Sequence, residues 1–188
     1  MCFYLCPTIW VHYTFMALQT MCNIDDVVFE LCISGRGNYS INPSNIVGLF
    51  MNTVFFRLKT EKNKTASSLL KLIHKQSIEI NEFDFLPIEY IEEELGVISY
   101  WLLSFEKYYE NYSHSILKPV LIREELDYKK LVDVITLPDG TMKVIFVFNP
   151  RHYRKHTIER LFSLIEKFML DITNNPDVIV SSLIQGQR

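Results

Sequence analysis

The chain has 188 residues, 48% of them hydrophobic and 22% charged, which allows one domain with a buried core and excludes a disordered or fibrous chain. Nineteen Lys and Arg side chains stand against 22 Asp and Glu side chains, for a formal charge of −3. Without an excess of positive charge there is no field to attract nucleic acid or anionic lipid, so we expect no nucleic-acid partner.

The uncharged start of the chain predicts a buried helix. The first 22 residues contain no Asp, Glu, Lys or Arg, whereas a signal peptide needs a basic start. A membrane span would have to begin at the terminus and include Pro7, His12 and Gln19. We therefore expect no membrane segment, and a helix over Thr8–Cys22 whose polar side chains share one narrow stripe.

The cysteines lie near the start of the chain, at Cys2, Cys6, Cys22 and Cys32. None is placed to tie distant parts together, which favours a reducing, cytoplasmic compartment. No histidine pairs with Cys2 and Cys6 at the spacing of a zinc site, so we expect no metal.

Apolar runs predict the strands of a sheet. Val27–Ile33 is rich in β-branched residues and is followed by a turn, as in a buried central strand. Residues 46–58 are apolar on both faces, which predicts a second strand inside the sheet and not at its edge. Further strands are predicted at residues 97–105, 120–122, 131–136 and 142–148. A Pro-Asp-Gly turn joins the last two strands as a hairpin.

The spacing of apolar residues predicts three more helices. One apolar face recurs over residues 69–80, and a shorter helix opens at Pro87, turns Leu95 inward and ends at a glycine. The last helix has a continuous apolar face over Ile158–Ile172, with Thr157 as its N-cap. The order α-β-β-α-α-β-β-β-β-α predicts an α/β fold with a mixed sheet covered by helices.

Four segments, taken in order, carry a resemblance to a known family. Asp25–Arg36 is followed by Asn45–Arg57, which fits the pattern V-G-hydrophobic-F-x-N-T-x-x-x-R. In Asp84–Ile91 a proline and a glutamate open a helix, and Phe146–Ile172 supplies a strand and a helix before Asn175-Pro176. The chain thereby resembles the second half of a nonribosomal peptide synthetase condensation domain.

This resemblance implies a fold and an activity. Residues 1–174 correspond to a C-terminal lobe with a chloramphenicol-acetyltransferase-like fold, and residues 175–188 to the start of a linker toward an adenylation domain. The parent domain forms amide bonds between aminoacyl or peptidyl thioesters held on peptidyl carrier proteins. Its catalytic His-His-x-x-x-Asp-Gly motif belongs to the N-terminal lobe, and no such run occurs here. The resemblance thus implies no catalytic residue and no bound cofactor in this chain, with phosphopantetheine thioesters delivered by the carriers.

By resemblance, the tunnel in which the two thioester arms meet is lined by Asn52, Thr53, Ser34 and Arg36. A carboxamide inside an apolar strand must be satisfied by hydrogen bonds, so Asn52 either faces the tunnel or bonds a neighbouring loop. Ser34 and Arg36 also have a plainer interpretation, as a turn serine and an arginine paired to a carboxylate. Glu30 stands where the family usually has glycine, which bears on the shape of the tunnel.

A basic cluster precedes the last helix. Arg151, Arg154 and Lys155 would contact a phosphate or the acidic surface of a carrier protein, but such a charge run is also typical of a solvated loop. The five histidines of the chain are His12, His74, His114, His152 and His156. None has a predicted partner that would orient it as a general base.

Two functions therefore compete. The chain is either part of an amide-forming condensation domain or a non-catalytic docking lobe that binds carrier proteins or a partner lobe. A coenzyme-A-dependent acyltransferase of the same fold would need a histidine motif that is missing here. A lobe without its partner should expose an apolar patch near Asn52, and the isolated chain should self-associate.

Overall fold

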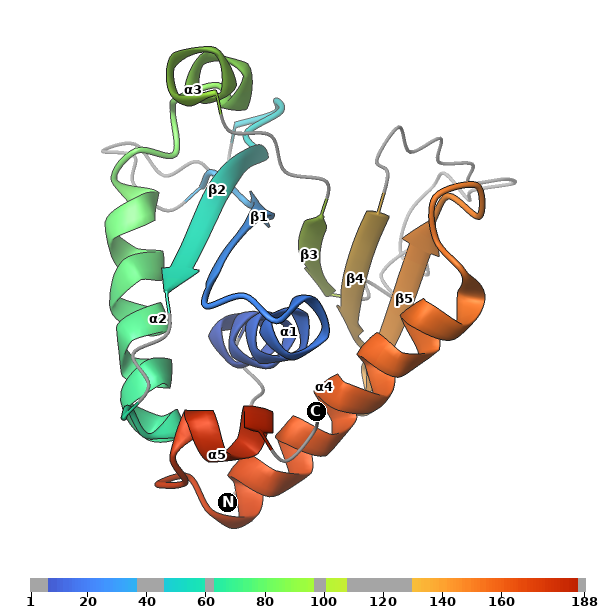
Figure 1. Cartoon of the computed structure of the whole chain (residues 1–188). Coiled ribbons are helices and arrows are strands. Elements are labelled where there is room, and N and C mark those ends of the chain that lie inside the picture. Colours follow the sequence, from blue (N-terminus) through green and yellow to red (C-terminus); the bar gives the residue numbers. More distant parts are fainter. Residues whose placement is uncertain (1–6, 37–45, 60–62, 97–100, 108–129, 186–188) are drawn as a thin grey trace.

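A computed structural model describes residues 7–36, 46–59, 63–96, 101–107 and 130–185. Five helices and five strands follow one another along the described chain in the order α1-β1-β2-α2-α3-β3-β4-β5-α4-α5 (Figure 1). The helices are α1 (Pro7–Cys22), α2 (Ala66–Asn81), α3 (Ile88–Leu95), α4 (Lys155–Asn174) and α5 (Val180–Gln185). The strands are β1 (Asp26–Ile33), β2 (Asn52–Lys59), β3 (Leu102–Lys107), β4 (Lys130–Thr136) and β5 (Met142–Phe148).

These strands form one mixed sheet with the order β2-β1-β3-β4-β5. β1 pairs antiparallel with β2 and parallel with β3, while β4 is parallel to β3 and antiparallel to β5. β1 therefore lies between two partners, as predicted for a central strand, and the predicted hairpin joins β4 to β5. Pairing of β1 with β3 is confined to Glu30–Leu102 and Leu31–Leu103, so the two strands part beyond these residues.

The core of the molecule forms around α1. This helix lies between α2 and α4 (Figure 1), and every residue from Trp10 to Thr20 is buried. The side chains of the same core cluster include Phe29, Phe56, Ile73, Leu161, Ile165 and Phe168. The buried helix predicted from the uncharged start of the chain is therefore confirmed.

Four polar side chains of α1, those of His12, Thr14, Gln19 and Thr20, are buried with it. Nε2 of His12, Oγ1 of Thr14 and Oε1 of Gln19 have no hydrogen-bond partner among the described residues. Burial lowers the pKa of His12 to about 4, so the imidazole is neutral near pH 7. The unpartnered polar atoms of this helix cost free energy, which the burial of the apolar side chains around them must offset.

The prediction for residues 46–58 is wrong in two respects. The strand begins only at Asn52, and Val47 and Leu49 in the preceding loop are exposed. β2 also lies at an edge of the described sheet, paired with β1. From Val54 onward, every second side chain of β2 is buried. One covered face is enough to hold a strand in place.

Two helix details also differ from the predictions. Leu95 is 69% exposed instead of facing inward, because α3 packs mainly against β2 and buries none of its residues. α4 begins at Lys155, with Arg154 as its N-cap, so Thr157 lies in the first turn and not at the cap. The strand predicted at residues 120–122 lies outside the described residues.

Residues 176–185 pack against the start of α2. The Ala66 amide donates to the Val178 carbonyl at 2.9 Å, and the Val180 amide donates to the Lys64 carbonyl at 3.0 Å. Val180 and Ile184 are buried in the core. The packed structure therefore extends at least to the end of α5, and a linker toward a following domain stays a prediction.

None of the helices in the described ranges combines the length and the apolar character that crossing a bilayer requires.

Candidate functional site

The turn after β1 is locked onto the segment that leads into β2. Gly35 has a φ of +60°, and a Cβ atom there would lie 1.8 Å from the Phe50 carbonyl oxygen, so only glycine fits. Arg36 donates from Nη2 to the Gly48 carbonyl at 3.1 Å and from Nη1 to the Ile46 carbonyl at 3.4 Å. Its guanidinium carbon lies 4.2 Å from the centre of the Phe50 ring, a cation–π contact. Arg36 therefore holds this loop in place.

Asn52 ties the start of β2 to the loop before α3. Its Nδ2 donates to the Asp84 carbonyl at 2.6 Å and to the Leu86 carbonyl at 2.9 Å, and its Oδ1 accepts from the Thr53 amide at 2.8 Å. Both amide hydrogens are used in these bonds. Of the two interpretations of Asn52, the bond to a neighbouring loop is the one observed, and a contact with a tunnel stays a prediction.

The four residues predicted to line the tunnel lie at one end of the β1–β2 pair. Asn52 lies opposite Ile33 in the register, and Thr53 follows it on β2. Ser34 comes directly after β1, is exposed, and accepts a hydrogen bond from the Arg36 amide at 3.5 Å. The structure thus brings these residues together at one edge of the sheet, through backbone pairing and loop contacts.

The basic cluster lies in a different loop, between β5 and the start of α4. Arg151, Arg154 and Lys155 are all exposed. The Lys155 Nζ lies 3.5 Å from Oε1 of Glu159 on the surface of the helix, a pair that contributes little in water. This geometry fits the solvated-loop interpretation, and a carrier or phosphate contact stays a prediction.

Glu30 is a carboxyl group buried in the middle of β1. It is 7% exposed and lies between Phe55 of β2 and Leu102 of β3 in the register. Burial raises the pKa of Glu30 to about 7, and the charge of Glu92 acts in the same direction. The signal for this site in the sequence is a lone acidic residue within an apolar strand.

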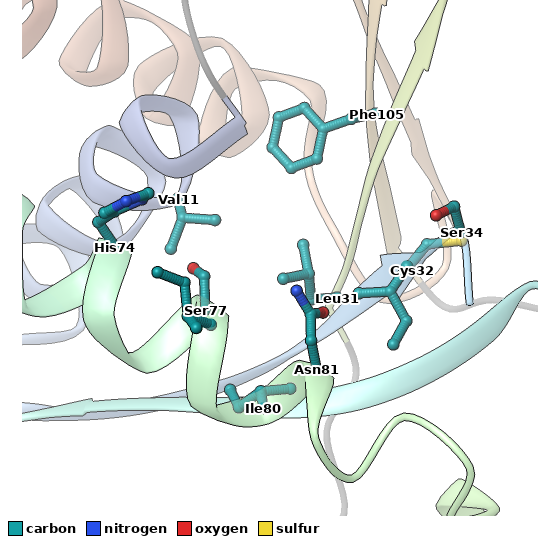
Figure 2. A pocket seen from close by; sticks show the side chains of 11 residues that line it. Val11, Leu31, Cys32, Ser34, His74, Ser77, Ile80, Asn81 and Phe105 are labelled. Carbon is teal, nitrogen blue, oxygen red and sulfur yellow. The ribbon is translucent and has the colours of Figure 1, made fainter. Parts of the chain in front are cut away.

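A cleft of about 390 Å³ lies between β1, β3, α1 and α2 (Figure 2). Its more buried part, the floor, includes Val11, Leu31, Ile33 and Phe105. Its rim includes the exposed Ser34, His74 and Asn81, and the half-buried Ser77 also lines the cleft. Ser34 is the one member of the predicted tunnel set that lines this cleft. The sequence gives only a weak signal for the cleft residues of α2, because polar residues at this spacing are typical of the outer face of an amphipathic helix.

The described residues supply little reactive chemistry. No group of three or more potential metal ligands comes together among them. His74, His152 and His156 are exposed and His12 is buried, and none of these four has an acidic partner that would orient it as a base. His114 lies outside the described residues.

The family model of the condensation domain matches residues 8–185. The chain belongs to the condensation-domain family. Its fold also matches the crystal structure of the starter condensation domain of rhizomide synthetase RzmA, with a TM-score of 0.72 and 14% sequence identity. That match covers 97% of this chain and 44% of the other. The predicted chloramphenicol-acetyltransferase-like fold is confirmed by this similarity.

Relatives of this condensation-domain chain are large nonribosomal peptide synthetases. Tyrocidine synthase 3 of Brevibacillus parabrevis is 28% identical over 171 residues, a match that covers 85% of this chain and 3% of that protein. Gramicidin S synthase 2 of Brevibacillus brevis is 24% identical, and the match covers 94% of this chain and 4% of that protein. The chain therefore spans a small fraction of the length of these relatives.

Loss of the Asn52 side chain should loosen the two loops that it joins. We expect Asn52→Ala to lower the free energy of unfolding by about 2–3 kcal/mol, because it removes hydrogen bonds to two carbonyls and one amide. Urea unfolding of the chain measures this change. The control is Asn174→Ala at the exposed end of α4, which should change stability by less than about 0.5 kcal/mol. Equal effects of the two substitutions would contradict the anchoring role of Asn52.

Glu30 should make the stability of the chain depend on pH. Its pKa of about 7 in the folded chain lies above the ordinary value of 4.5, so folding takes up a proton between these pH values. The free energy of unfolding should therefore fall by about 2 kcal/mol through this group as the pH rises from 4.5 through 7. We expect Glu30→Gln to remove this fall and to be the more stable form at pH 8.

The measurement is urea unfolding of the parent chain and of Glu30→Gln at pH 5 and at pH 8. His12 acts in the opposite sense, because its lowered pKa makes stability rise with pH between about 4 and 6.5. The difference between the two chains cancels the contribution of His12, since both carry it. A difference that stays constant with pH would refute the role of Glu30.

Proposed function

We propose that this chain is the C-terminal lobe of a condensation domain that forms amide bonds between aminoacyl or peptidyl thioesters held on carrier proteins. One observation carries the proposal: the family model covers residues 8–185 of the chain, yet the chain corresponds to 44% of the RzmA condensation-domain chain. A complete domain then needs a second part of similar size. That part is the N-terminal lobe, which supplies the His-His-x-x-x-Asp-Gly motif and with it the general base.

Exposed apolar side chains beside Asn52 support a place for this second lobe. The members of this apolar patch are Val47, Leu49, Met51, Phe83 and Phe85. They lie in the two loops that the Asn52 hydrogen bonds hold together. Apolar side chains gathered on a surface mark an interaction site. In our proposal the N-terminal lobe covers the patch, and the isolated chain self-associates through it.

The residues at the end of the β1–β2 pair position the tunnel wall in this proposal. Ser34 and Thr53 face the thioester arms, while Arg36 and Asn52 act as positioning residues. Their role follows from the hydrogen bonds that fix the loops before β2 and before α3. None of them acts as an acid or a base, which agrees with the assignment of catalysis to the other lobe.

The basic cluster is the carrier contact in this proposal. Arg151, Arg154 and Lys155 are exposed, and the first turn of α4 has no acidic residue, so the side chains of Arg151 and Arg154 can attract an incoming anion, although Lys155 is paired with Glu159 one turn further on. The anion is the phosphate of the phosphopantetheine arm or an acidic side chain of the carrier. The arm arrives on the carrier, and residues 175–188 lead on toward an adenylation domain of a cytoplasmic synthetase.

Amide formation from two carrier-bound aminoacyl thioesters tests the central proposal. We expect the chain alone to give no product above the uncatalysed rate, and a mixture with an N-terminal condensation half that carries the histidine motif to give product. Mass spectrometry of the carrier-bound thioesters measures the outcome. The control is the same half with its second motif histidine replaced by alanine, which should give no product.

Turnover by the chain alone would overturn the assignment of the base to the other lobe. A reconstituted pair that binds carriers but forms no amide would instead favour the docking-lobe function.

Charge reversal in the basic cluster tests the carrier contact. We expect Arg154→Glu to raise the Kd for a phosphopantetheine-loaded carrier protein at least about tenfold, because attraction becomes repulsion at the contact. Calorimetric titration measures the Kd. Lys71→Glu makes the same charge change at an exposed position of α2 and should have little effect. Equal weakening by both substitutions would show a general effect of net charge and refute a specific contact.

A further inference from the structure

β5 lies at an open edge of the described sheet. It pairs with β4 on one side, and no strand among the described residues pairs with its other side (Figure 1). An edge strand presents a row of backbone N–H and C=O groups that can pair with another chain. Proteins usually protect such an edge with charged side chains, proline or a covering segment. The two edges of this sheet differ in that protection.

The edge formed by β2 is protected. Arg57 and Lys59 are both exposed and place charges along it. The Gln76 side chain of α2 donates from Nε2 to the Arg57 carbonyl at 2.8 Å, so one acceptor of this strand is already in use. In contrast, the stretch from Val144 to Phe148 in β5 consists of five apolar residues with no charge and no proline. β5 therefore has the composition of a strand that pairs with a further strand.

An apolar groove lies beside this open edge. It has a volume of about 410 Å³ between β5 and α4, and its apolar lining is Val144, Phe146, Ile158 and Phe162. The rings of Phe146 and Phe162 meet edge to face with their centres 5.7 Å apart, yet Phe162 remains 41% exposed. The exposed Glu159 and Ser163 also line the groove. Such an apolar centre with a polar rim is typical of a protein–protein interface.

We propose that β5 pairs antiparallel with β5 of a second copy of this chain, across a two-fold axis at Ile145. Ile145 is the middle residue of the seven in this strand, so the pairing uses its whole length. Val144 of one copy then lies opposite Phe146 of the other, and such pairs of a β-branched and an aromatic residue are favourable. A two-fold axis perpendicular to the joined sheet keeps both α4 helices on one face. The two grooves therefore meet over the seam, and each copy covers the groove of the other.

The distribution of charge favours a second copy in this register. Lys143 is the one charged residue of β5. With the axis at Ile145 it lies opposite Val147 of the second copy, whereas an axis at Lys143 would place two lysines directly opposite each other, which is unfavourable. Beside the groove, Lys155 and Glu159 form an ion pair, so the start of α4 adds no repulsion. The strand contact spans about 23 Å, and the joined grooves add the apolar area that a stable dimer needs.

Two opposite charges at Val147 test this pairing. Val147 is 37% exposed, so either charge is tolerated by the single chain. Val147→Lys places lysines opposite each other at two points of the dimer, and we expect the Kd of dimerisation to rise at least about tenfold. Val147→Glu places a carboxylate opposite each Lys143 and should keep or lower the Kd. Sedimentation equilibrium measures both values, and thermal unfolding checks that both variants are folded.

The net charge of the chain provides an internal control. Because the chain carries a formal charge of −3, a general effect of net charge would help Val147→Lys to associate and hinder Val147→Glu. The proposal predicts the reverse order. Equal Kd values for the two variants, or tighter association of Val147→Lys, would overturn it.

Hydrogen exchange at low and high protein concentration separates this pairing from association through the apolar patch. We expect exchange over residues 142–148 to slow as the concentration rises, while exchange over residues 52–59 of β2 stays unchanged. This result should persist when the N-terminal condensation half is added, because that half covers the patch and not β5. Slowing confined to residues 46–51 and 83–86 would overturn the pairing of β5 and leave the proposed function standing. A chain that stays monomeric up to about 1 mM would also overturn the pairing.

Discussion

The burial of the middle of α1 is the constraint on which the rest of the structure depends. A helix with every residue from Trp10 to Thr20 out of water must have neighbours on all sides, and α2, α4, α5 and β1 supply them. Burial of so many large apolar side chains is the main stabilising term. It offsets the unpartnered polar atoms of His12, Thr14 and Gln19. α2, α4 and α5 therefore gather around α1, whereas α3 packs against β2.

A different kind of interaction takes over at the end of β1 and the start of β2. The segments there are held by the hydrogen bonds of Arg36 and Asn52 and by one close backbone approach at Gly35, not by a shared apolar core. Arg36 fixes one loop and Asn52 fixes the other. Loops held in this way can present apolar side chains to a partner without collapsing onto the core. The edge of the sheet is thus suited to positioning and docking, while the chemistry belongs elsewhere.

β1 serves two surfaces at once. Neighbouring side chains of a strand point to opposite faces of a sheet, so Leu31 belongs to the core side and the cleft while Glu30 lies on the other side. The buried carboxyl of Glu30 favours its protonated form, since burial raises its pKa. β1 therefore packs against the core, lines the cleft through Leu31, and carries the titratable carboxyl group of Glu30.

Local pattern in the sequence by itself determined most of the elements. The uncharged helix, the strand over Val27–Ile33, the hairpin and the long last helix follow from residue periodicity and turn chemistry, which depend on near neighbours in the chain. The motif around Asn52 also pointed to the family. Exposure could not be predicted in the same way. Val47 and Leu95 are apolar and exposed, because burial depends on which other elements lie opposite.

Only the tertiary structure decided what the individual site residues touch. Asn52 bonds carbonyls that lie 32 and 34 residues further along the chain, and the cleft takes its walls from four elements that no local pattern relates. β1 and β3 pair at Glu30–Leu102 and Leu31–Leu103, residues that lie far apart in the sequence. Periodicity reports the face on which a side chain lies, but its partner is set by the packing of distant segments, and so the contacts of the site had to come from the folded chain.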